Sequence, residues 1–310
     1  MQKEVLAVQP CKQDKGSNFK QNPYKAWINI GGNVSKPNYP PRKFQFLGHK
    51  FNFPTLLLSK ISRLRFVEAC TINFDCFPEY LYCETIPIIW DCWPHLWDKT
   101  ELWLKKHRVK CAIFTSSQVS LEMKRRLPNI NIYTVTEGID TIQYHEGNLL
   151  VNRDIDLLEY GRVERNLFSH YIDGINHINV KNSNGRMSSF EMLLKTISEA
   201  KITVAIPRCD SDKKYTGGIE TLTQRFWECM LSRTVLLGRA PKELTDLIGY
   251  NPVIDIDYEN YEEQIKNIVA HIEEYQPLVD KNRETALRMS PWEIRMKQIM
   301  DWLISLGYEI

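Results

Sequence analysis

The sequence predicts an α/β protein that contains two parallel-sheet domains, and three observations support this fold class. Short apolar runs alternate with longer amphipathic stretches from residue 85 onward, as strands and helices do in parallel sheets. The alternation stops at a polar gap over 146–152 and then starts again. The chain has 310 residues, which suits two domains of ordinary size. We therefore expect an N-terminal domain over 1–150 and a C-terminal domain over 151–310, with a cleft between them.

The N-terminal domain is expected to begin irregularly. Prolines and glycines crowd the segment 9–41, so we predict little regular structure in about the first 40 residues. A polar turn over 137–140 is expected to follow the last strand of this domain. Apolar runs predict strands at 85–91, 110–115 and 131–136, and amphipathic stretches predict helices at 95–107 and 117–127.

The C-terminal domain repeats the same alternation. A helix is expected over 188–200, with Ser188 or Ser189 as its N-cap. A polar loop over 211–218 precedes a second helix at 219–232, and three helical stretches follow to the C-terminus. Apolar runs predict strands at 155–161, 177–180, 201–207, 234–238 and 253–257.

Composition excludes several classes of protein. The apolar fraction of 43% and the charged fraction of 25% are those of a soluble globular protein. A net charge of +2 lacks the basic excess of a nucleic-acid-binding protein, so no nucleic acid partner is expected. The N-terminus has no signal-peptide pattern and no apolar run is long enough to span a membrane, which predicts a cytoplasmic protein. None of the eight cysteines forms a Cys-x-x-Cys pair, so we expect buried thiols in a reducing compartment.

The most informative motif is a pair of glutamates, Glu220 and Glu228, which are separated by seven residues and follow Gly217-Gly218. If Glu220 lies in the loop before the helix, its carboxylate can lean across the helix N-terminus, where free N–H groups suit a phosphate. Two carboxylates at opposite ends of a phosphate site suit a sugar–diphosphate–nucleoside. The alternative is structural, because the helix dipole favours glutamates near helix starts in any protein.

The segment 220–241 resembles the donor-binding segment of retaining glycosyltransferases with the GT-B fold. It is most similar to glycosyltransferase family 4 (group 1 glycosyltransferases), whose hallmark is two glutamates with seven residues between them. The resemblance extends to 155–163, which ends in Gly161-Arg162-Val163, and to the turn 136–141. It covers the first 80 or so residues poorly. It implies a GT-B fold, in which two Rossmann-like α/β domains face a cleft.

The resemblance implies a role for each glutamate. Glu228 would accept hydrogen bonds from the ribose hydroxyls of the nucleotide. Glu220 would contact the transferring sugar and stabilise positive charge at its anomeric carbon, as a catalytic residue. The family also implies retention of anomeric configuration, and neither a metal ion nor another cofactor is expected.

The same resemblance implies a set of contacts to the diphosphate. Arg162 resembles the family's phosphate-binding arginine, whose cation stabilises the departing diphosphate. Arg165 stands in for a lysine at altered spacing, and the alternative is that it pairs with Glu164 or Glu159 on the surface. The family's glycine-rich turn is replaced here by Thr-Leu-Thr. The expected donor-binding backbone groups are those of Gly218, Thr221, Leu222 and Thr223.

The acceptor is expected to bind the N-terminal domain, where tryptophans cluster at 90–103. Asp91 ends an expected strand, and His95 follows four residues later, so either could position an acceptor hydroxyl. The alternative is that the tryptophans are core and that His95 caps a helix. Basic residues beside them predict either contact with an anionic membrane surface or a solvated helix face. These residues are Lys99, Lys105, Lys106, His107, Arg108 and Lys110.

The sequence is therefore interpreted as a glycosyltransferase that moves a sugar from a nucleotide-sugar donor to a hydroxyl of a glycan or lipid-linked acceptor, as in polysaccharide biosynthesis. Its last helix, near 290–306, is expected to pack back on the N-terminal domain. Two alternatives stay open. One is a non-catalytic GT-B-like protein that binds nucleotide or glycan or serves as a partner subunit. The other is a nucleotide-sugar epimerase, although no matching histidine and carboxylate set is found.

Overall fold

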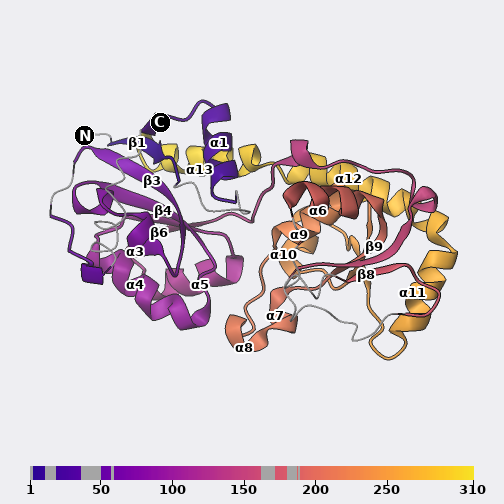
Figure 1. The fold of residues 1–310 in the computed structure, drawn as a ribbon. Coiled ribbons are helices and arrows are strands. Elements are labelled where there is room, and N and C mark those ends of the chain that lie inside the picture. Colours follow the sequence, from indigo (N-terminus) through magenta and orange to yellow (C-terminus); the bar gives the residue numbers. More distant parts are fainter. Residues whose placement is uncertain are drawn as a thin grey trace. The chain divides into compact units, whose positions relative to one another are not determined.

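The computed structural model describes residues 3–10, 19–35, 50–56, 59–161, 172–179, 187 and 189–310. The chain forms two compact units, each built around a parallel sheet (Figure 1). The first unit contains Met1–Glu137, Tyr215–Ile219 and Trp292–Ile310, and the second contains Gly138–Lys214 and Glu220–Pro291. The division at residues 137 and 138 lies earlier than the expected boundary near 150, because Ile139 and Tyr144 pack into the core of the second unit.

The first unit is an α/β unit in which every described strand pairing is parallel. The strand order is β12-β1-β3-β4-β5-β6, and β2 also pairs with β1. The expected strands at 85–91, 110–115 and 131–136 correspond to β4, β5 and β6. The strands are β1 (Lys3–Val8), β2 (Val34–Ser35), β3 (Ile61–Glu68), β4 (Glu84–Trp90), β5 (Cys111–Phe114), β6 (Asn131–Thr134) and β12 (Tyr308–Glu309).

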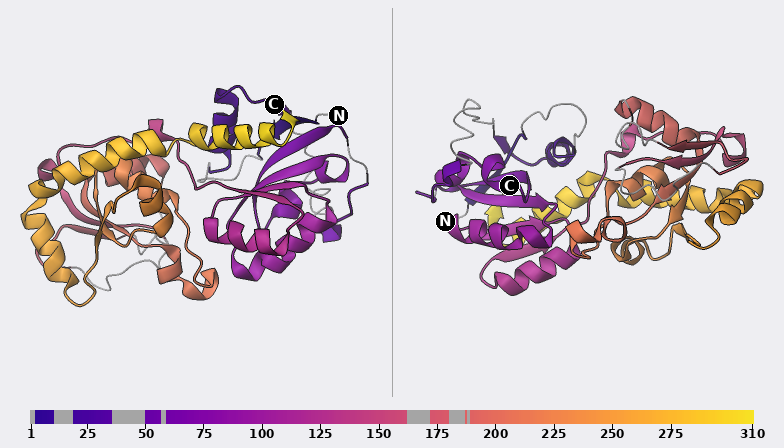
Figure 2. Two further views of the ribbon diagram at one scale, coloured as in Figure 1. Left: turned by 180° about the vertical axis from the view of Figure 1, so that it is seen from behind. Right: turned by 60° about the horizontal axis from the view of Figure 1, so that its bottom comes forward.

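Helices cover both faces of this sheet. Figures 1 and 2 show α1 (Gln21–Asn29) and α13 (Trp292–Ser305) side by side on one face. The other face carries α3 (Ile72–Asp75), α4 (Trp97–Lys106) and α5 (Ser117–Arg126). The last two correspond to the helices expected at 95–107 and 117–127.

Helix α1 lies in a segment that was expected to be irregular, and that expectation is wrong for 21–29. Pro23 occupies the first turn, where its missing N–H costs no hydrogen bond. Tyr24, Ala26 and Trp27 are buried against the sheet. Burial of these three apolar side chains therefore outweighs the local signal of nearby prolines and glycines.

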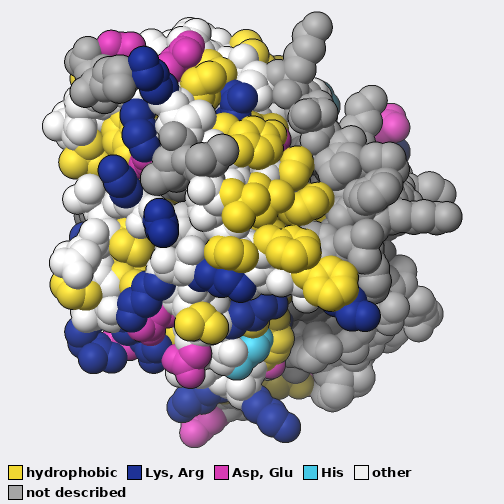
Figure 3. All heavy atoms as spheres, turned by 90° about the vertical axis from the view of Figure 1, so that its left-hand side faces the viewer, with side chains coloured by type: hydrophobic (Ala, Val, Ile, Leu, Met, Phe, Trp, Pro, Cys, Tyr) yellow, Lys and Arg dark blue, Asp and Glu magenta, His cyan; other side chains and the backbone are white. Residues whose placement is uncertain are grey.

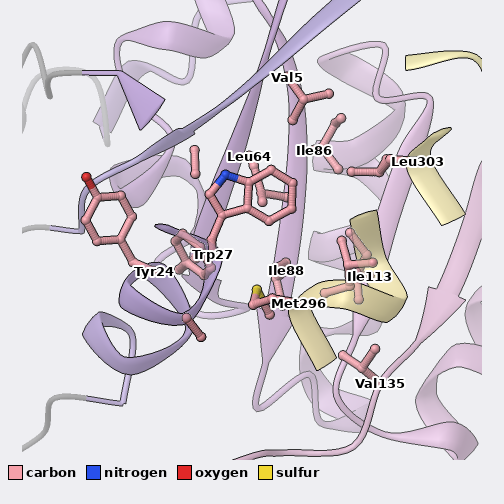
Figure 4. Close-up of a cluster of buried hydrophobic side chains, with 14 of the residues drawn as sticks. Val5, Tyr24, Trp27, Leu64, Ile86, Ile88, Ile113, Val135, Met296 and Leu303 are labelled. Atoms are coloured by element: carbon pink, nitrogen blue, oxygen red, sulfur yellow. The ribbon is translucent and has the colours of Figure 1, made fainter. Parts of the chain in front are cut away.

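The core on the α1 and α13 face joins residues from distant parts of the chain. Figure 4 shows Trp27 of α1 among apolar side chains of the strands, including Leu64 and Ile88. Met296 and Leu303 reach the same cluster from α13, almost at the C-terminus. Helix α13 is thus an integral part of the first unit.

The second unit holds a five-stranded parallel sheet with the order β11-β10-β9-β7-β8. Strand β8 pairs with one side of β7 and β9 with the other, so the strand order reverses at β7. Ligands bind at such a switch point, beyond the carboxyl ends of the strands. The strands are β7 (Ile155–Glu159), β8 (His177–Asn179), β9 (Ala200–Ala205), β10 (Val235–Gly238) and β11 (Val253–Asp255).

Helices also cover both faces of the second sheet. Helices α6 (Phe190–Glu199), α9 (Gln224–Leu231) and α10 (Lys242–Ile248) pack on one face, and α11 (Tyr261–Ala270) packs on the other. Helix α12 (Gln276–Met289) contributes Ala286 to the first of these cores and Val279 to the second. The Ser189 hydroxyl accepts a hydrogen bond from the Met192 N–H, so Ser189 is the N-cap of α6.

Two local expectations in the second unit are wrong. The helix expected over 219–232 begins only at Gln224, because Thr223 is in an extended conformation. The expected polar loop over 211–218 contains helical turns, since α7 (Arg208–Ser211) ends within it and α8 (Lys213–Thr216) follows. The later start of α9 matters for the candidate site, because it leaves Glu220 in the turn before the helix.

Three further structural findings concern the described residues alone. No described helix combines the length and the apolar character that crossing a membrane requires. The described cysteines are all free thiols, of which Cys70 is exposed and the others are buried. No described cluster of histidine, cysteine, aspartate and glutamate has the arrangement of a metal site.

Candidate functional site

The candidate site lies in the second unit, where β7 ends at the switch point of the sheet. Strand β7 is followed by Tyr160 and Gly161, and Gly161 has a φ of 112°, a backbone conformation that favours glycine. Helix α9 packs on the same face of the sheet as Leu158 of β7. This packing brings the side chain of Glu228, in the second turn of α9, to the end of β7.

Two tyrosine hydroxyls hold the carboxylate of Glu228. The Tyr160 hydroxyl donates to Oε2 at 2.8 Å, and the Tyr144 hydroxyl donates to Oε1 at 3.2 Å. Burial, followed by the nearby carboxylate, raises the pKa of Tyr144 well above its ordinary value. Burial also raises the pKa of Tyr160, so both phenols stay protonated as donors.

Glu228 keeps acceptor capacity beyond these two bonds. A carboxylate offers about four lone-pair positions, and the tyrosines use one on each oxygen. The side chain is half-buried rather than fully enclosed. The arrangement therefore presents a carboxylate of fixed orientation that can accept hydrogen bonds from the hydroxyls of a ligand.

Glu220 lies in a second polar cluster, beside the end of β10. Its Oε2 pairs with Arg239 Nη1 at 2.6 Å, and Arg239 Nε donates to Asp210 Oδ2 at 2.6 Å. Its Oε1 accepts the Lys242 N–H at 2.6 Å, at the start of α10. Glu220 thus stabilises the N-terminus of α10 and joins Asp210 and Arg239 in one ionic network.

The backbone after Glu220 is only partly open to an anion. The Leu222 N–H donates to Glu243 Oε2 at 2.8 Å, so a carboxylate occupies one of the three N–H groups predicted to contact a diphosphate. The Leu222 side chain is fully buried and anchors this turn. Thr221 and Thr223 are half-buried on either side of it.

Other predicted donor-site residues lie elsewhere. Gly218, at a φ of 82°, groups with the first unit through the segment Tyr215–Ile219 and not with Glu228. Arg162 and Arg165 lie outside the described residues. The structure therefore brings the two glutamates into the same unit with Thr221, Leu222 and Thr223, and not with Gly218.

The predicted acceptor residues both lie in the first unit. Asp91 follows β4 at a φ of 50° and is exposed. His95 is also exposed, and its ring lies 4.8 Å from the ring of Tyr215 in the same unit. These side chains are accessible to a ligand of the first unit.

Most of the neighbouring tryptophans are core residues, which agrees with the alternative that the tryptophans at 90–103 are structural. Trp90, Trp93 and Trp103 are each at most 3% exposed, and Trp97 is half-buried under the guanidinium of Arg126. His107 is buried as well, so it takes no part in a basic surface. The remaining basic residues of this segment are exposed, namely Lys99, Lys105, Lys106, Arg108 and Lys110.

The sequence pattern did not reveal Tyr144, Tyr160 and Arg239. Tyr160 had a usable signal, because it directly precedes Gly161 at the end of a strand. Tyr144 had none, since it reaches Glu228 across 84 positions of the chain. Arg239 follows the glycine that ends β10, which is another strand-end position in a parallel sheet.

Comparisons with known proteins identify the fold. No protein-family model matches the chain, and no curated protein sequence matches it. Among solved structures, a sucrose-phosphate synthase from Thermosynechococcus elongatus is similar with a TM-score of 0.61 and 13% identity, covering 98% of this chain and 100% of that one.

Two other solved structures are similar over nearly their whole length. AviGT4, a glycosyltransferase involved in avilamycin A biosynthesis, has a TM-score of 0.55 and 13% identity, covering 98% of this chain and 97% of its own. HepE from Anabaena, in complex with UDP-glucose, has a TM-score of 0.59 and 7% identity, covering 97% and 99%. At such identities the likeness shows the fold alone, and that fold is GT-B.

Proposed function

We propose that this protein is a glycosyltransferase that moves a sugar from a nucleotide-sugar donor to a hydroxyl of a glycan or lipid-linked acceptor. The observation that carries the proposal is the carboxylate of Glu228, which two tyrosine hydroxyls orient at the switch point of a GT-B sheet. A diol such as that of ribose matches a carboxylate with unused acceptor positions. The complex of HepE with UDP-glucose supports a nucleotide-sugar donor.

In this proposal Glu220 contacts the transferring sugar. Its side chain is only 12% exposed, and its carboxylate is held by Arg239 and by the N-terminus of α10, so its orientation is fixed before a sugar binds. A negative charge held there would stabilise positive charge that develops at the anomeric carbon. Asp210 adds a second carboxylate to the same network and makes it suitable for hydrogen bonds from sugar hydroxyls.

The proposed reaction exchanges one bond at the anomeric carbon. The bond to the diphosphate oxygen breaks, and its electron pair goes to that oxygen. The acceptor hydroxyl forms the new bond, and its proton passes to the departing diphosphate. We propose that the configuration is retained and that arginine cations, rather than a metal ion, offset the growing negative charge.

The acceptor is proposed to bind the first unit, near Asp91 and His95. Both side chains are exposed, and Asp91 directly follows the carboxyl end of β4, where ligands of parallel sheets bind. We expect Asp91→Asn and His95→Gln to lower transfer to an acceptor while leaving nucleotide affinity unchanged. Loss of nucleotide affinity in either variant would contradict this assignment.

A lipid-linked acceptor would bring the first unit to the cytoplasmic face of an anionic membrane. Figure 3 shows one face of this unit on which hydrophobic side chains gather beside lysines and arginines. Phe51, Phe53 and Leu56 are about half exposed or more, and the ammonium of Lys50 lies 5.9 Å from the ring of Phe51. Sedimentation with vesicles that contain anionic lipid, but not with neutral vesicles, is expected; equal sedimentation with both would contradict the electrostatic part.

The deciding experiment measures binding of UDP, GDP and ADP by calorimetry to the wild-type protein, Glu228→Gln and the control Glu284→Gln. Glu284 is an exposed glutamate of the same unit. We expect one nucleotide to bind the wild type and the control, and to bind Glu228→Gln roughly 10- to 100-fold more weakly, because hydrogen bonds to the carboxylate are lost. Failure of all three nucleotides to bind, or unchanged binding by Glu228→Gln, would contradict the proposal.

A non-catalytic GT-B-like binding protein is the second candidate. The Glu243 carboxylate on the Leu222 N–H favours it, because that carboxylate occupies a position where a diphosphate is expected to be bound. Measuring the release of sugar from the bound nucleotide sugar in the presence of candidate acceptors distinguishes a transferase from a non-catalytic binding protein. Tight binding of the nucleotide sugar without release or transfer of the sugar would favour this second function.

A further inference from the structure

The guanidinium of Arg225 lies against the end of β7. Arg225 is in the first turn of α9, and its Cζ lies 4.4 Å from the centre of the Tyr160 ring. This is a cation–π contact, in which the guanidinium lies over the ring and its N–H groups can still donate hydrogen bonds to other partners. The positive charge is therefore held beside Tyr160 and Gly161, the two residues that follow β7.

Arg225 has no anionic partner among the described residues. None of its nitrogens donates to a described acceptor, and its Nε is buried without a hydrogen bond. Most other half-buried arginines of this unit are paired, as Arg233 is with Asp280 and Arg239 is with Glu220. Buried N–H groups that lack a protein acceptor are uncommon and call for another acceptor.

Gly161 has no side chain, and this leaves room for the guanidinium of Arg225. A Cβ atom at residue 161 would lie 1.7 Å from Nη2 of Arg225, which is far inside van der Waals contact. The φ of 112° adds a second reason for glycine at this position. Glycine at residue 161 thus lets the guanidinium of Arg225 lie against the backbone at the end of β7.

The position of Arg225 relative to Glu228 fits a nucleoside diphosphate. The hydroxyl of Tyr160 bonds to Glu228, and the ring of the same tyrosine carries the guanidinium. Glu228, which is proposed to accept hydrogen bonds from the ribose, is therefore separated from the Arg225 cation by about one tyrosine side chain. The ribose and the phosphates of a nucleotide are separated by a similar distance. The Leu222 N–H is bonded to Glu243, so this backbone group is not available to donate a hydrogen bond to a phosphate.

We infer that Arg225 binds the diphosphate of the donor, in a bidentate contact made by the edge of its guanidinium. The inference rests on the proposed function and names a phosphate-binding residue within that site. Arg225 compensates for the Leu222 N–H, which Glu243 occupies, because its cation can bind a phosphate that this N–H group does not.

The test uses the full chain and three variants: Arg225→Gln, Arg225→Lys and the control Arg288→Gln. Arg288 is an exposed arginine of α12. Whichever of UDP, GDP and ADP binds the wild type is compared with the matching nucleoside, by calorimetry and by ligand-observed NMR. Melting temperatures show whether each variant folds.

We expect Arg225→Gln to bind the nucleoside diphosphate roughly 10- to 100-fold more weakly and the nucleoside as the wild type does, because a charged hydrogen-bond pair is removed. Arg225→Lys should retain part of the affinity, since it keeps the charge but not the bidentate geometry. Arg288→Gln should bind both ligands as the wild type does.

The outcomes separate this inference from the function on which it rests. If the wild type binds no nucleoside diphosphate, the proposed function and the role of Arg225 both fail. If Glu228→Gln loses binding while a folded Arg225→Gln binds the diphosphate as tightly as the wild type, only the role of Arg225 is overturned. Equal losses for nucleoside and diphosphate in Arg225→Gln would also overturn it, since they would indicate a general disturbance of the site.

Discussion

At the scale of single residues, the Glu228 carboxylate depends on its two tyrosine partners. Tyr160 is buried between Glu228 and Cys229, and burial raises the pKa of the Cys229 thiol to about 12. The thiol is therefore neutral at ordinary pH and adds no negative charge beside the carboxylate. Orientation of Glu228 accordingly comes from neutral donors, which leave its charge available to a ligand.

Replacement of Tyr160 by phenylalanine should weaken nucleotide binding. The change removes the 2.8 Å hydrogen bond to Glu228 while keeping the ring that the Arg225 guanidinium contacts. We expect a loss of roughly three- to tenfold in nucleotide affinity, because the carboxylate is held by one donor instead of two. Calorimetric titration measures it, and Tyr250→Phe, which removes a hydroxyl bonded to Asn282 and Thr285, is the matched control. Equal affinities for Tyr160→Phe and the wild type would contradict the positioning role.

His107 is a buried histidine of the first unit. Its Nε2 lies 2.7 Å from Asn52 Oδ1, and its ring contacts Tyr80 and Trp103. Burial, with a smaller contribution from the Lys106 charge, lowers the pKa of His107 from 6.5 to about 4. The folded protein therefore binds this proton less readily than the unfolded chain does.

This shift predicts a loss of stability in mild acid. Between the unfolded pKa of 6.5 and the folded value of about 4, the unfolded state binds the proton, so the free energy of unfolding falls as the pH falls. We expect a contribution of about 2 kcal/mol to be lost between pH 7 and pH 5. Urea unfolding at both pH values measures it. For His107→Gln, the fall in the free energy of unfolding between pH 7 and pH 5 should be smaller than that of the wild type by about 2 kcal/mol. For His145→Gln, at an exposed position, the fall should equal that of the wild type.

At the scale of elements, the start of α9 organises the candidate site. The extended residue Thr223 ends the turn that carries Glu220, and Arg225 and Glu228 then follow on the first two turns of the helix. Glu220 and Glu243 each bond to a backbone N–H across the gap between this turn and α10. One short turn therefore connects two helix starts and places the two glutamates in different surroundings.

The C-terminal helix α13 gives an element-scale prediction. Leu303 is fully buried in the core of the first unit, whereas the adjacent Ile304 is 52% exposed. We expect Leu303→Ala to lower the free energy of unfolding by about 2–5 kcal/mol, because it leaves a cavity. Ile304→Ala removes a similar side chain and should change it by less than about 1 kcal/mol. Chemical denaturation followed by circular dichroism compares them, and similar losses would contradict the packing of α13.

At the scale of the whole molecule, residues near the C-terminus pack with residues near the N-terminus in the first unit. Strand β12, near the C-terminus, pairs in parallel with β1, near the N-terminus. Arg295 of α13 is buried and donates to Thr136 Oγ1 at 3.1 Å, within the first unit. The first unit is thus assembled from segments that lie at opposite ends of the sequence, while the second is formed almost entirely by the residues between them.

The sequence alone determined the fold class and most of the regular elements after residue 85. Apolar runs such as those of β4 and β10 are short and buried on both faces, so local hydrophobicity is enough to locate them. The spacing of Glu220 and Glu228 likewise singled out one turn and one helix. Helix α1 was not predicted, because its stability comes from Trp27 packing against strands that lie far away in the sequence.

Only the tertiary structure decided which groups surround each glutamate. Tyr144 and Tyr160 meet Glu228 from positions 84 and 68 residues away, and Arg239 meets Glu220 only because β10 and the turn after Gly218 end near each other. Contacts of this kind depend on how strands are ordered in the sheet, and the local pattern of a sequence does not contain that order. The sequence thus specified the chemical groups of the site, and the fold specified their partners.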